Sequence, residues 1–265
     1  MYLHGAHVTH YQPPGGQALL FLSDESWFAP GTPIRGGVPV CFPWFAIRAD
    51  DLEAPAHGFA RLMEWAVESI DETAGGEVAA TLVLHSSDET RKIWPHDFTL
   101  RHIVKVGTSL DLTLQTENTG GDAARFEQAL HTYFRVGDVE NIRVFGLEGT
   151  VYVSKAEGMA RENQGPDPIT IRSETDRIYL DTRAACELED PGLGRKVTVR
   201  KTGSDTTVVW NPWIDKSTSM PDFGNDEWRR MLCIETCAVA EHAITLEPGA
   251  THLMSAHVTV EAESP

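Results

Sequence analysis

The sequence predicts an all-β protein, built as one large antiparallel sandwich with at most a few short helical turns. From residue 79 onward, most runs alternate apolar and polar residues with a period of two, as strands with one buried face do. Turn-forming residues separate these runs at short intervals, and helical periodicity is confined to residues 89–93 and 225–230. The chain has no strand–helix–strand rhythm, no G-x-G-x-x-G motif and no P-loop, which argues against a nucleotide-binding α/β enzyme.

The first expected strand is residues 2–8, which read as the middle of a strand, so we expect a strand upstream of it to be missing. The clearest strand starts at Leu110, where leucine at every second position alternates with polar residues until the turn at residues 118–121. Other expected strands are residues 79–85, 99–106, 142–153, 169–180, 196–201, 207–210, 231–239, 243–246 and 252–261. Turns are expected at residues 107–108, 165–166, 190–192, 203–205 and 248–249.

Length and charge limit the class of protein. The 265 residues can form a large core, and all-β domains of this size often stay undivided, so we expect one domain over residues 1–265. A formal charge of −17 argues against nucleic acid or an anionic membrane as a partner. No stretch approaches the ~18 apolar residues of a membrane span, and the first residues lack a signal-peptide pattern. We therefore expect a cytoplasmic monomer.

The four cysteines, Cys41, Cys186, Cys233 and Cys237, form no C-x-x-C pair, which argues against a disulfide scaffold or a structural zinc site. On a strand, Cys233 and Cys237 would lie about 13 Å apart at ~3.3 Å per residue, too far to share one ion. We therefore expect no metal site.

Residues 35–44, RGGVPVCFPW, place one fixed positive charge among glycines, prolines and aromatic rings. Glycine lets backbone approach a ligand closely, and proline stiffens the chain. The guanidinium of Arg35 is suited to bidentate capture of a phosphate or a carboxylate. The alternative is a tight surface turn with a solvated arginine.

Residues 57–61, HGFAR, form a second candidate. His57 and Arg61 could both point into a cleft, or both could be exposed at the entry to a strand. If Arg61 lies near Arg35, the two guanidinium groups would match a phosphate dianion.

Residues 130–134, LHTYF, contain His131, which on a strand shares its face with Glu127, Ala129 and Tyr133. This mixed face is typical of the floor of a cleft, where a histidine can act as a general acid near neutral pH. The alternative is a half-buried structural histidine.

Glu235 lies between Cys233 and Cys237 on one face of an expected strand. Its carboxylate is either exposed or held in a partly dry pocket. In a dry pocket, desolvation would raise the pKa of Glu235 and make it a better base.

Two further segments carry polar or aromatic groups suited to a sugar. Asp176 in the segment 174–179 could accept hydrogen bonds from sugar hydroxyls, although taken alone this segment reads as a surface strand entry. Residues 209–213 read as a strand end that delivers an aromatic ring to a loop.

Together these motifs resemble the hexose-6-phosphate mutarotases (glucose-6-phosphate 1-epimerases) of the galactose-mutarotase-like superfamily. The resemblance runs from about residue 3 to residue 260. Six motifs carry it, in this order: residues 34–43, 57–61, 130–134, 175–179, 210–213 and Glu235. The family fold is a large β-supersandwich, which agrees with the alternation.

The resemblance implies interconversion of the α and β anomers of a hexose 6-phosphate, glucose 6-phosphate above all. His131 would be the general acid and Glu235 the general base that open the hemiacetal ring and close it on the other face. No metal, nucleotide or other cofactor is required. The residues implied to bind the substrate are Arg35 and Arg61 at the phosphate or neighbouring hydroxyls, Asp176 at the sugar, and His57 beside them.

Two departures from the family pattern matter. The family often carries glutamine where this chain has Ala56, so one hydrogen bond to the substrate is expected to be absent. The family also usually has a strand before the one at residues 3–8, and its loss would expose a sheet edge.

Three other functions stay open at this point. An aldose 1-epimerase acting on unphosphorylated sugar would not need the pair Arg35 and Arg61. A non-catalytic carbohydrate-binding or sugar-phosphate-binding module would depend on the aromatic residues more than on His131. A glycoside hydrolase would use Asp176 and Glu235 as its carboxylate pair and leave His131 idle.

Overall fold

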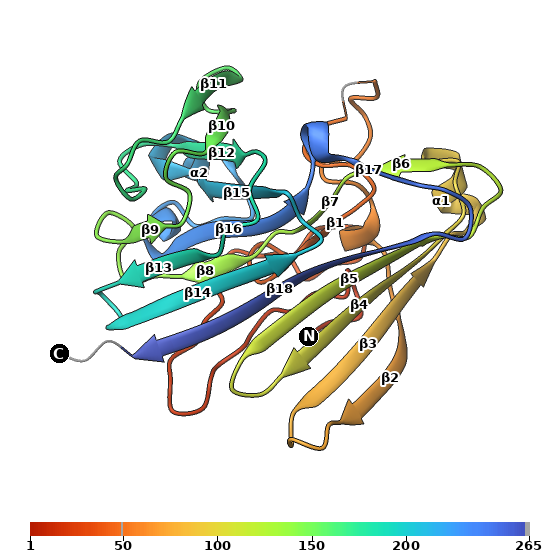
Figure 1. Cartoon of the computed structure of the whole chain (residues 1–265), viewed down its shortest axis with the longest axis horizontal. Coiled ribbons are helices and arrows are strands. Elements are labelled where there is room, and N and C mark those ends of the chain that lie inside the picture. Colours follow the sequence, from red (N-terminus) through yellow and green to blue (C-terminus); the bar gives the residue numbers. More distant parts are fainter. Residues whose placement is uncertain (49, 263–265) are drawn as a thin grey trace.

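Two large antiparallel sheets lie one over the other in the computed structural model, which describes residues 1–48 and 50–262 (Figure 1). The first sheet contains β1 (Val40–Cys41), β7 (Gln128–Leu130), β8 (Tyr133–Arg135), β10 (Val151–Ser154), β11 (Ala160–Asn163), β12 (Thr175–Tyr179), β15 (Thr206–Asn211) and β16 (Met231–Ala238). The second contains β2 (Ala66–Glu72), β3 (Val78–His85), β4 (Phe98–Val106), β5 (Leu110–Asn118), β9 (Arg143–Phe145), β13 (Cys186–Asp190), β14 (Arg195–Thr202) and β18 (Thr251–Ala262).

The remaining elements are short. A two-stranded sheet is formed by β6 (Ala124–Phe126) and β17 (Ile244–Leu246). The helical turns are α1 (Asp88–Ile93), α2 (Trp213–Ser219), η1 (Ala60–Leu62), η2 (Glu227–Arg230) and η3 (Ala240–His242). No helix among the described residues is long and apolar enough to cross a membrane. The predicted all-β class with a few helical turns is therefore confirmed.

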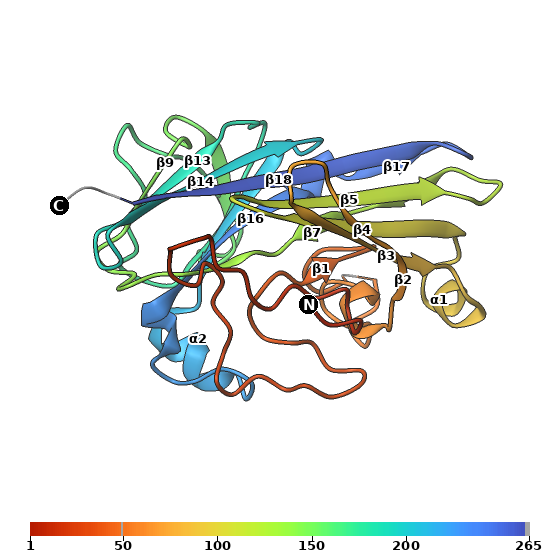
Figure 2. The same cartoon turned by 90° about the horizontal axis from the view of Figure 1, so that it is seen from below.

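The strand order places β16 in the middle of the first sheet, which runs β1-β7-β16-β15-β12-β10-β11, with β8 paired to the other half of β16. The second sheet runs β2-β3-β4-β5-β18-β14-β13-β9. In Figure 2 the N-terminal segment crosses the face of the first sheet that points away from the second sheet. Every residue of β16 is buried as a result, because both of its faces are covered.

The period-two pattern predicts most strands well. In β5 the residues at every second position, from Leu110 onward, are buried and their neighbours are half-buried. The predicted helical turns at residues 89–93 and 225–230 coincide with α1 and η2. A capping box between Ser87 and Thr90 begins α1, which explains why the alternation stops there.

The predicted strand at residues 2–8 is wrong. Gly5 and Ala6 adopt positive φ angles of 71° and 46°, and the backbone groups of Tyr2 and His7 bond each other at 2.9 and 3.0 Å. The segment therefore folds back on itself and makes only isolated bridges to Glu64 and Val38.

Two other predicted strands are shorter than the pattern indicates. Residues 142–153 form β9 and β10, which belong to different sheets and are separated by a turn with positive φ at Gly146 and Gly149. Of residues 169–180, only β12 is a strand. The short helix α2 was not predicted.

Candidate active site

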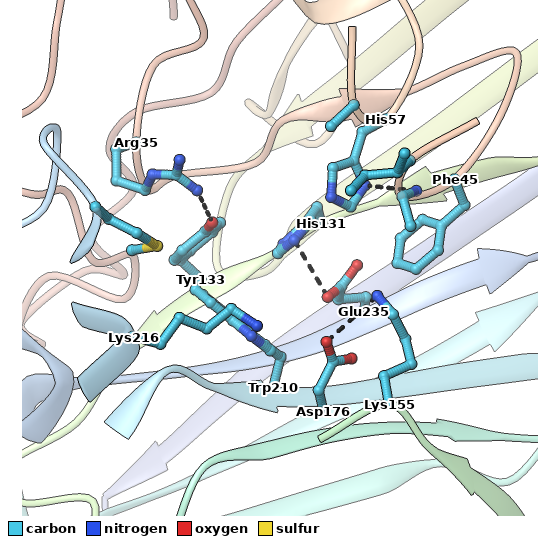
Figure 3. A pocket seen from close by; sticks show the side chains of 14 residues that line it. Arg35, Phe45, His57, His131, Tyr133, Lys155, Asp176, Trp210, Lys216 and Glu235 are labelled. Carbon is cyan, nitrogen blue, oxygen red and sulfur yellow. Dashed lines mark hydrogen bonds and ion pairs between the residues drawn. The ribbon is translucent and has the colours of Figure 1, made fainter. Parts of the chain in front are cut away.

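An open pocket of about 190 Å³ lies over the centre of the first sheet (Figure 3). It brings together five of the six predicted site residues: Arg35, His57, His131, Asp176 and Glu235. Two lysines, Lys155 and Lys216, and the rings of Phe45, Tyr133 and Trp210 also line it. The pocket thus combines charged groups with aromatic faces.

Glu235 stands in the middle of β16, opposite Val208 of β15, and only 1% of its surface is exposed. Its Oε2 atom has no hydrogen-bond partner among the described residues. Burial, reinforced by the nearby charge of Asp176, raises the pKa of Glu235 well above its usual value. Of the two environments that the sequence left open for this carboxyl, exposed or partly dry, the structure shows the dry one.

His131 lies in the gap between β7 and β8, and its backbone N–H donates to the carbonyl of Pro39 at 3.0 Å. The imidazole stacks on the ring of Tyr133, with 4.8 Å between centroids and 13° between planes. Trp210 meets the imidazole edge-on at 5.9 Å. These rings fix the imidazole so that Nε2 faces Glu235.

The two side chains meet at 3.4 Å, between Nε2 of His131 and Oε1 of Glu235. Burial, followed by the charges of Arg61 and Arg35, lowers the pKa of His131 well below its usual value. Because the pKa of Glu235 moves in the opposite direction, both groups favour their neutral forms. In that state the proton between the two side chains is on the carboxyl group of Glu235. Its transfer to Nε2 of His131 would give an imidazolium–carboxylate ion pair. This arrangement can deliver one proton and accept another at adjacent atoms.

Arg35 enters the pocket from the loop that follows Ile34. Its guanidinium forms an ion pair with Asp222 at 3.1 Å and donates to the hydroxyl of Tyr133 at 3.2 Å. The loop needs Gly37, because φ is 60° there and a Cβ would lie 2.2 Å from the carbonyl oxygen of Val8. The predicted glycine-dependent presentation of an arginine is therefore observed, and Asp222 is an unpredicted partner.

Arg61 lies beside the pocket but not on its wall. It is buried within η1, and its Nη2 donates to the carbonyl of Ala56 at 2.8 Å, while its Nε finds no partner in the part of the chain that the structure describes. Ala56 itself lines the pocket. Arg61 therefore acts on the site through its positive charge and by binding the backbone of Ala56. Its guanidinium does not line the pocket.

His57 lines the pocket and packs its ring 5.4 Å from that of His131. Burial, with the charge of Arg61, lowers its pKa well below the usual value, so His57 is neutral. The next residue, Gly58, has φ of 74°, and a Cβ there would lie 2.0 Å from the carbonyl oxygen of Phe42. The glycine of this motif therefore allows close packing of the two loops.

Asp176 on β12 is buried and pairs with Lys155, whose Nζ lies 3.3 Å from Oδ2. The backbone N–H of Lys155 also donates to the Asp176 carbonyl at 2.8 Å. A carboxylate held in this way can accept hydrogen bonds from hydroxyl groups in the pocket. Lys155 follows β10 directly, and no feature of its sequence neighbourhood distinguished it from a solvent-exposed lysine.

Lys216 is the second residue that the sequence did not reveal. It lies on α2, and its Nζ pairs with Glu174 at 2.8 Å. The available signal was Asn211, whose side-chain oxygen accepts the N–H of Trp213 and so begins the helix after Pro212. Asn-Pro was instead interpreted as the loop after a strand.

Sequence comparison finds a matching family model and several relatives. Residues 1–258 match the family model described as aldose 1-epimerase. A protein of Cenchrus ciliaris is 38% identical over 257 residues, covering 94% of this chain and 77% of its own. A protein of Escherichia coli is 39% identical over 254 residues, covering 95% and 83%. Both carry the name "Putative glucose-6-phosphate 1-epimerase".

Solved structures show the same architecture. A crystal structure of a "putative mutarotase" from Salmonella typhimurium superposes with a TM-score of 0.92 and 34% identity, covering 98% of this chain and 86% of that one. A galactose mutarotase related enzyme from Lactobacillus acidophilus has a TM-score of 0.79 at 17% identity, covering 100% and 94%. The second similarity shows the galactose-mutarotase-like fold alone.

Proposed function

The chain belongs to the aldose 1-epimerase family, and on that premise we propose that it interconverts the α and β anomers of a hexose 6-phosphate, glucose 6-phosphate first among them. The enzyme is an isomerase, and the reaction is acid–base opening and closure of the sugar ring. The observation that carries the proposal is the 3.4 Å contact between His131 and Glu235 on the pocket wall.

Ring opening needs two proton transfers at oxygens bonded to the same carbon. One proton leaves the anomeric hydroxyl, and one arrives at the ring oxygen. Glu235 as a carboxylate takes the first, and His131 as an imidazolium gives the second. The open aldehyde turns about its C1–C2 bond, and the two residues reverse their roles for closure. An acid and a base held side by side match this requirement.

The negative charge of the substrate's phosphate favours the ion-pair form of His131 and Glu235. The positive charge of Arg35 is one of the causes that lower the pKa of His131. A phosphate dianion beside Arg35 would cancel that effect and raise the pKa of His131. Arg35 is not among the main charges acting on Glu235. The phosphate therefore favours transfer of the shared proton from Glu235 to His131.

The phosphate end of the substrate belongs beside Arg35 and Lys216. In Figure 3 both side chains lie on the opposite side of His131 from Phe45 and Lys155. Two cations at one end of the pocket suit a phosphate, and Asp176 at its floor suits sugar hydroxyls. Arg61 adds its positive charge from behind the wall, and His57 offers a neutral polar edge.

One observation favours a second candidate, an aldose 1-epimerase of unphosphorylated sugar. Arg35 and Lys216 already pair with Asp222 and Glu174, at 3.1 and 2.8 Å. If these pairs persist with substrate bound, little positive charge is left for a phosphate. Polarimetry of freshly dissolved α-glucose and of the α anomer of glucose 6-phosphate separates the two candidates. We expect the protein to accelerate the rotation change of the phosphate ester, and acceleration of free glucose alone would favour the second.

The sequence-based expectations of a monomer and of a cytoplasmic location are part of this proposal. The four cysteines are free and buried, as is usual for proteins of a reducing compartment. Size-exclusion chromatography with light scattering tests the first expectation.

A further inference from the structure

Two residues that line the pocket, His131 and Glu235, lie beside Cys233, a buried thiol that the anomerisation reaction does not use. His131, Cys233 and Glu235 each offer one ligand atom, and these atoms all lie within 4.8 Å of one another. We propose that they form a binding site for a thiophilic divalent cation such as Zn²⁺ or Cd²⁺, which blocks the acid–base pair. The site itself rests on geometry, and only its inhibitory effect rests on the proposed function.

The spacing fits one ion. Zinc binds nitrogen and oxygen at about 2.0–2.2 Å and sulfur at about 2.3 Å, so the ligand atoms of a tetrahedral site lie about 3.3–3.6 Å apart. Nε2 of His131 and Oε1 of Glu235 are 3.4 Å apart. Cys233 and Glu235 are two residues apart on β16 and therefore share a face of the strand. A small rotation of the thiol would complete three corners of the tetrahedron.

The buried atoms at this point also lack partners. Oε2 of Glu235 and Nδ1 of His131 make no hydrogen bond to any residue that the structure describes, although the two residues are only 1% and 6% exposed. A buried carboxyl with an unused oxygen gains from a ligand that can occupy it. Imidazole, thiolate and carboxylate are the three ligand types that zinc prefers, and the open pocket leaves its fourth position for water.

Coordination involves protons and no electrons. The ion displaces the thiol proton of Cys233 and the proton shared by His131 and Glu235, and both protons pass to solvent. Nitrogen and carboxylate are then bound to the ion and cannot exchange protons with a sugar. The cation should therefore inhibit in competition with the substrate.

The chain offers two matched controls. Cys237 is also buried on the same face of β16, but it lies on the far side of Glu235 and about 13 Å from Cys233 at ~3.3 Å per residue. His242 belongs to a more exposed group with Asp181 and Glu241, the other such cluster among the described residues. In that group Glu241 is already paired with Arg161 at 2.9 Å.

The experiment is a Cd²⁺ titration of the metal-free protein, followed by calorimetry and by the ultraviolet sulfur-to-cadmium charge-transfer band. We expect one ion per chain, with the band present in the wild type, in Cys237→Ala and in His242→Ala. Cys233→Ala should lose the band and at least about 100-fold in affinity. Cys233→Ser, which keeps the volume but offers a poor ligand to a thiophilic ion, should behave in the same way if the alanine variant does not fold.

Several results would overturn the site: no Cd²⁺ bound by the wild type, a band that survives in both Cys233 variants, or a band lost in Cys237→Ala. A parallel assay measures Zn²⁺ inhibition of anomerisation, with about 100-fold weaker inhibition expected in the Cys233 variants relative to their own uninhibited rates. Cadmium binding by a protein without anomerase activity would refute the proposed function and leave the metal site in place.

Discussion

Nε2 of His131 lies 3.4 Å from Oε1 of Glu235, although Glu235 is on β16 and His131 is in the short segment between β7 and β8. The contact exists because β16 pairs with β7 through one half and with β8 through the other, and His131 occupies the gap between these two strands. Both groups are buried, and their pKa values are shifted in opposite directions. The central claim is that this pair moves the two protons of sugar ring opening.

Replacing Glu235 by glutamine should abolish the acceleration of anomerisation. The amide keeps the shape of the side chain but cannot accept the hydroxyl proton, so we expect a loss of roughly 10²–10⁴-fold in kcat. Thermal unfolding provides the control. Because burial raises the pKa of Glu235, its ionisation destabilises the native state above the unfolded pKa near 4.5. Glu235→Gln should therefore be at least as stable as wild type at pH 7, and a folded variant with full activity contradicts its role as base.

Replacing Arg35 by glutamine should weaken binding of the phosphorylated sugar. We expect KM for glucose 6-phosphate to rise by about 10-fold or more, since a charge-assisted contact contributes about 1.5–3 kcal/mol. The single variant also leaves Asp222 buried without its partner, which lowers stability on its own. The double variant Arg35→Gln with Asp222→Asn separates the effect on stability from the effect on binding. It should regain the stability of wild type, but its KM for glucose 6-phosphate should stay raised. An unchanged KM in both variants would place the phosphate elsewhere.

Replacing Lys155 by methionine should move the acidic limb of the pH–rate profile. The charge of Lys155 lowers the pKa of Glu235 against the effect of burial, so its removal raises that pKa further. A carboxylate base with a higher pKa becomes active only at higher pH, and the ascending limb of kcat/KM should shift upward. Lys216→Met is the matched control, because Lys216 is not among the charges acting on Glu235. A limb that moves equally in both variants contradicts this assignment.

Buried histidines should make the fold sensitive to acid. Burial lowers the pKa of His102 to about 4 and that of His7 to about 3, both from 6.5. A lowered histidine pKa means that the unfolded chain binds more protons, so the stability is fully present above pH 6.5 and is lost as pH falls toward the folded pKa. Each histidine contributes a slope of at most about 1.4 kcal/mol per pH unit in that window.

Urea unfolding between pH 5 and 6 measures this slope. In His102→Asn the amide can still donate to the carbonyl of Ala6, which the imidazole Nδ1 contacts at 3.0 Å, but it does not titrate. The dependence of unfolding free energy on pH should therefore be shallower by up to about 1.4 kcal/mol per unit than in wild type. An identical slope would mean that His102 is not buried in its neutral form.

The all-β class followed from local alternation, whereas the set of pocket residues followed from the resemblance of six ordered motifs to a known family. Alternation around Glu235 indicates which face it shares with Cys233, but it leaves open whether that face is exposed or buried. Residues 2–8 also alternate, but positive φ at Gly5 and Ala6 turns them back on themselves, and alternation does not reveal that. Pairings between distant segments, such as Arg35 with Asp222, have no signal in a single sequence.

Arg61 shows the limit of motif spacing. Its place next to His57 correctly puts it near the pocket, yet the helical turn η1 directs its guanidinium to the carbonyl of Ala56. Conversely, Lys216 faces the pocket because α2 follows the end of β15, and helical patterning in that short segment is too weak to detect.

The most direct test is magnetisation-exchange NMR of the anomeric protons of glucose 6-phosphate, measured with wild-type protein, with Glu235→Gln and with free glucose as the comparison sugar. We predict faster exchange between the α and β signals of the phosphate ester with wild type, a smaller effect on free glucose, and no acceleration with the variant. Equal exchange rates with and without wild-type protein, or equal acceleration by Glu235→Gln, would contradict the assignment of His131 and Glu235 as the proton-transferring pair.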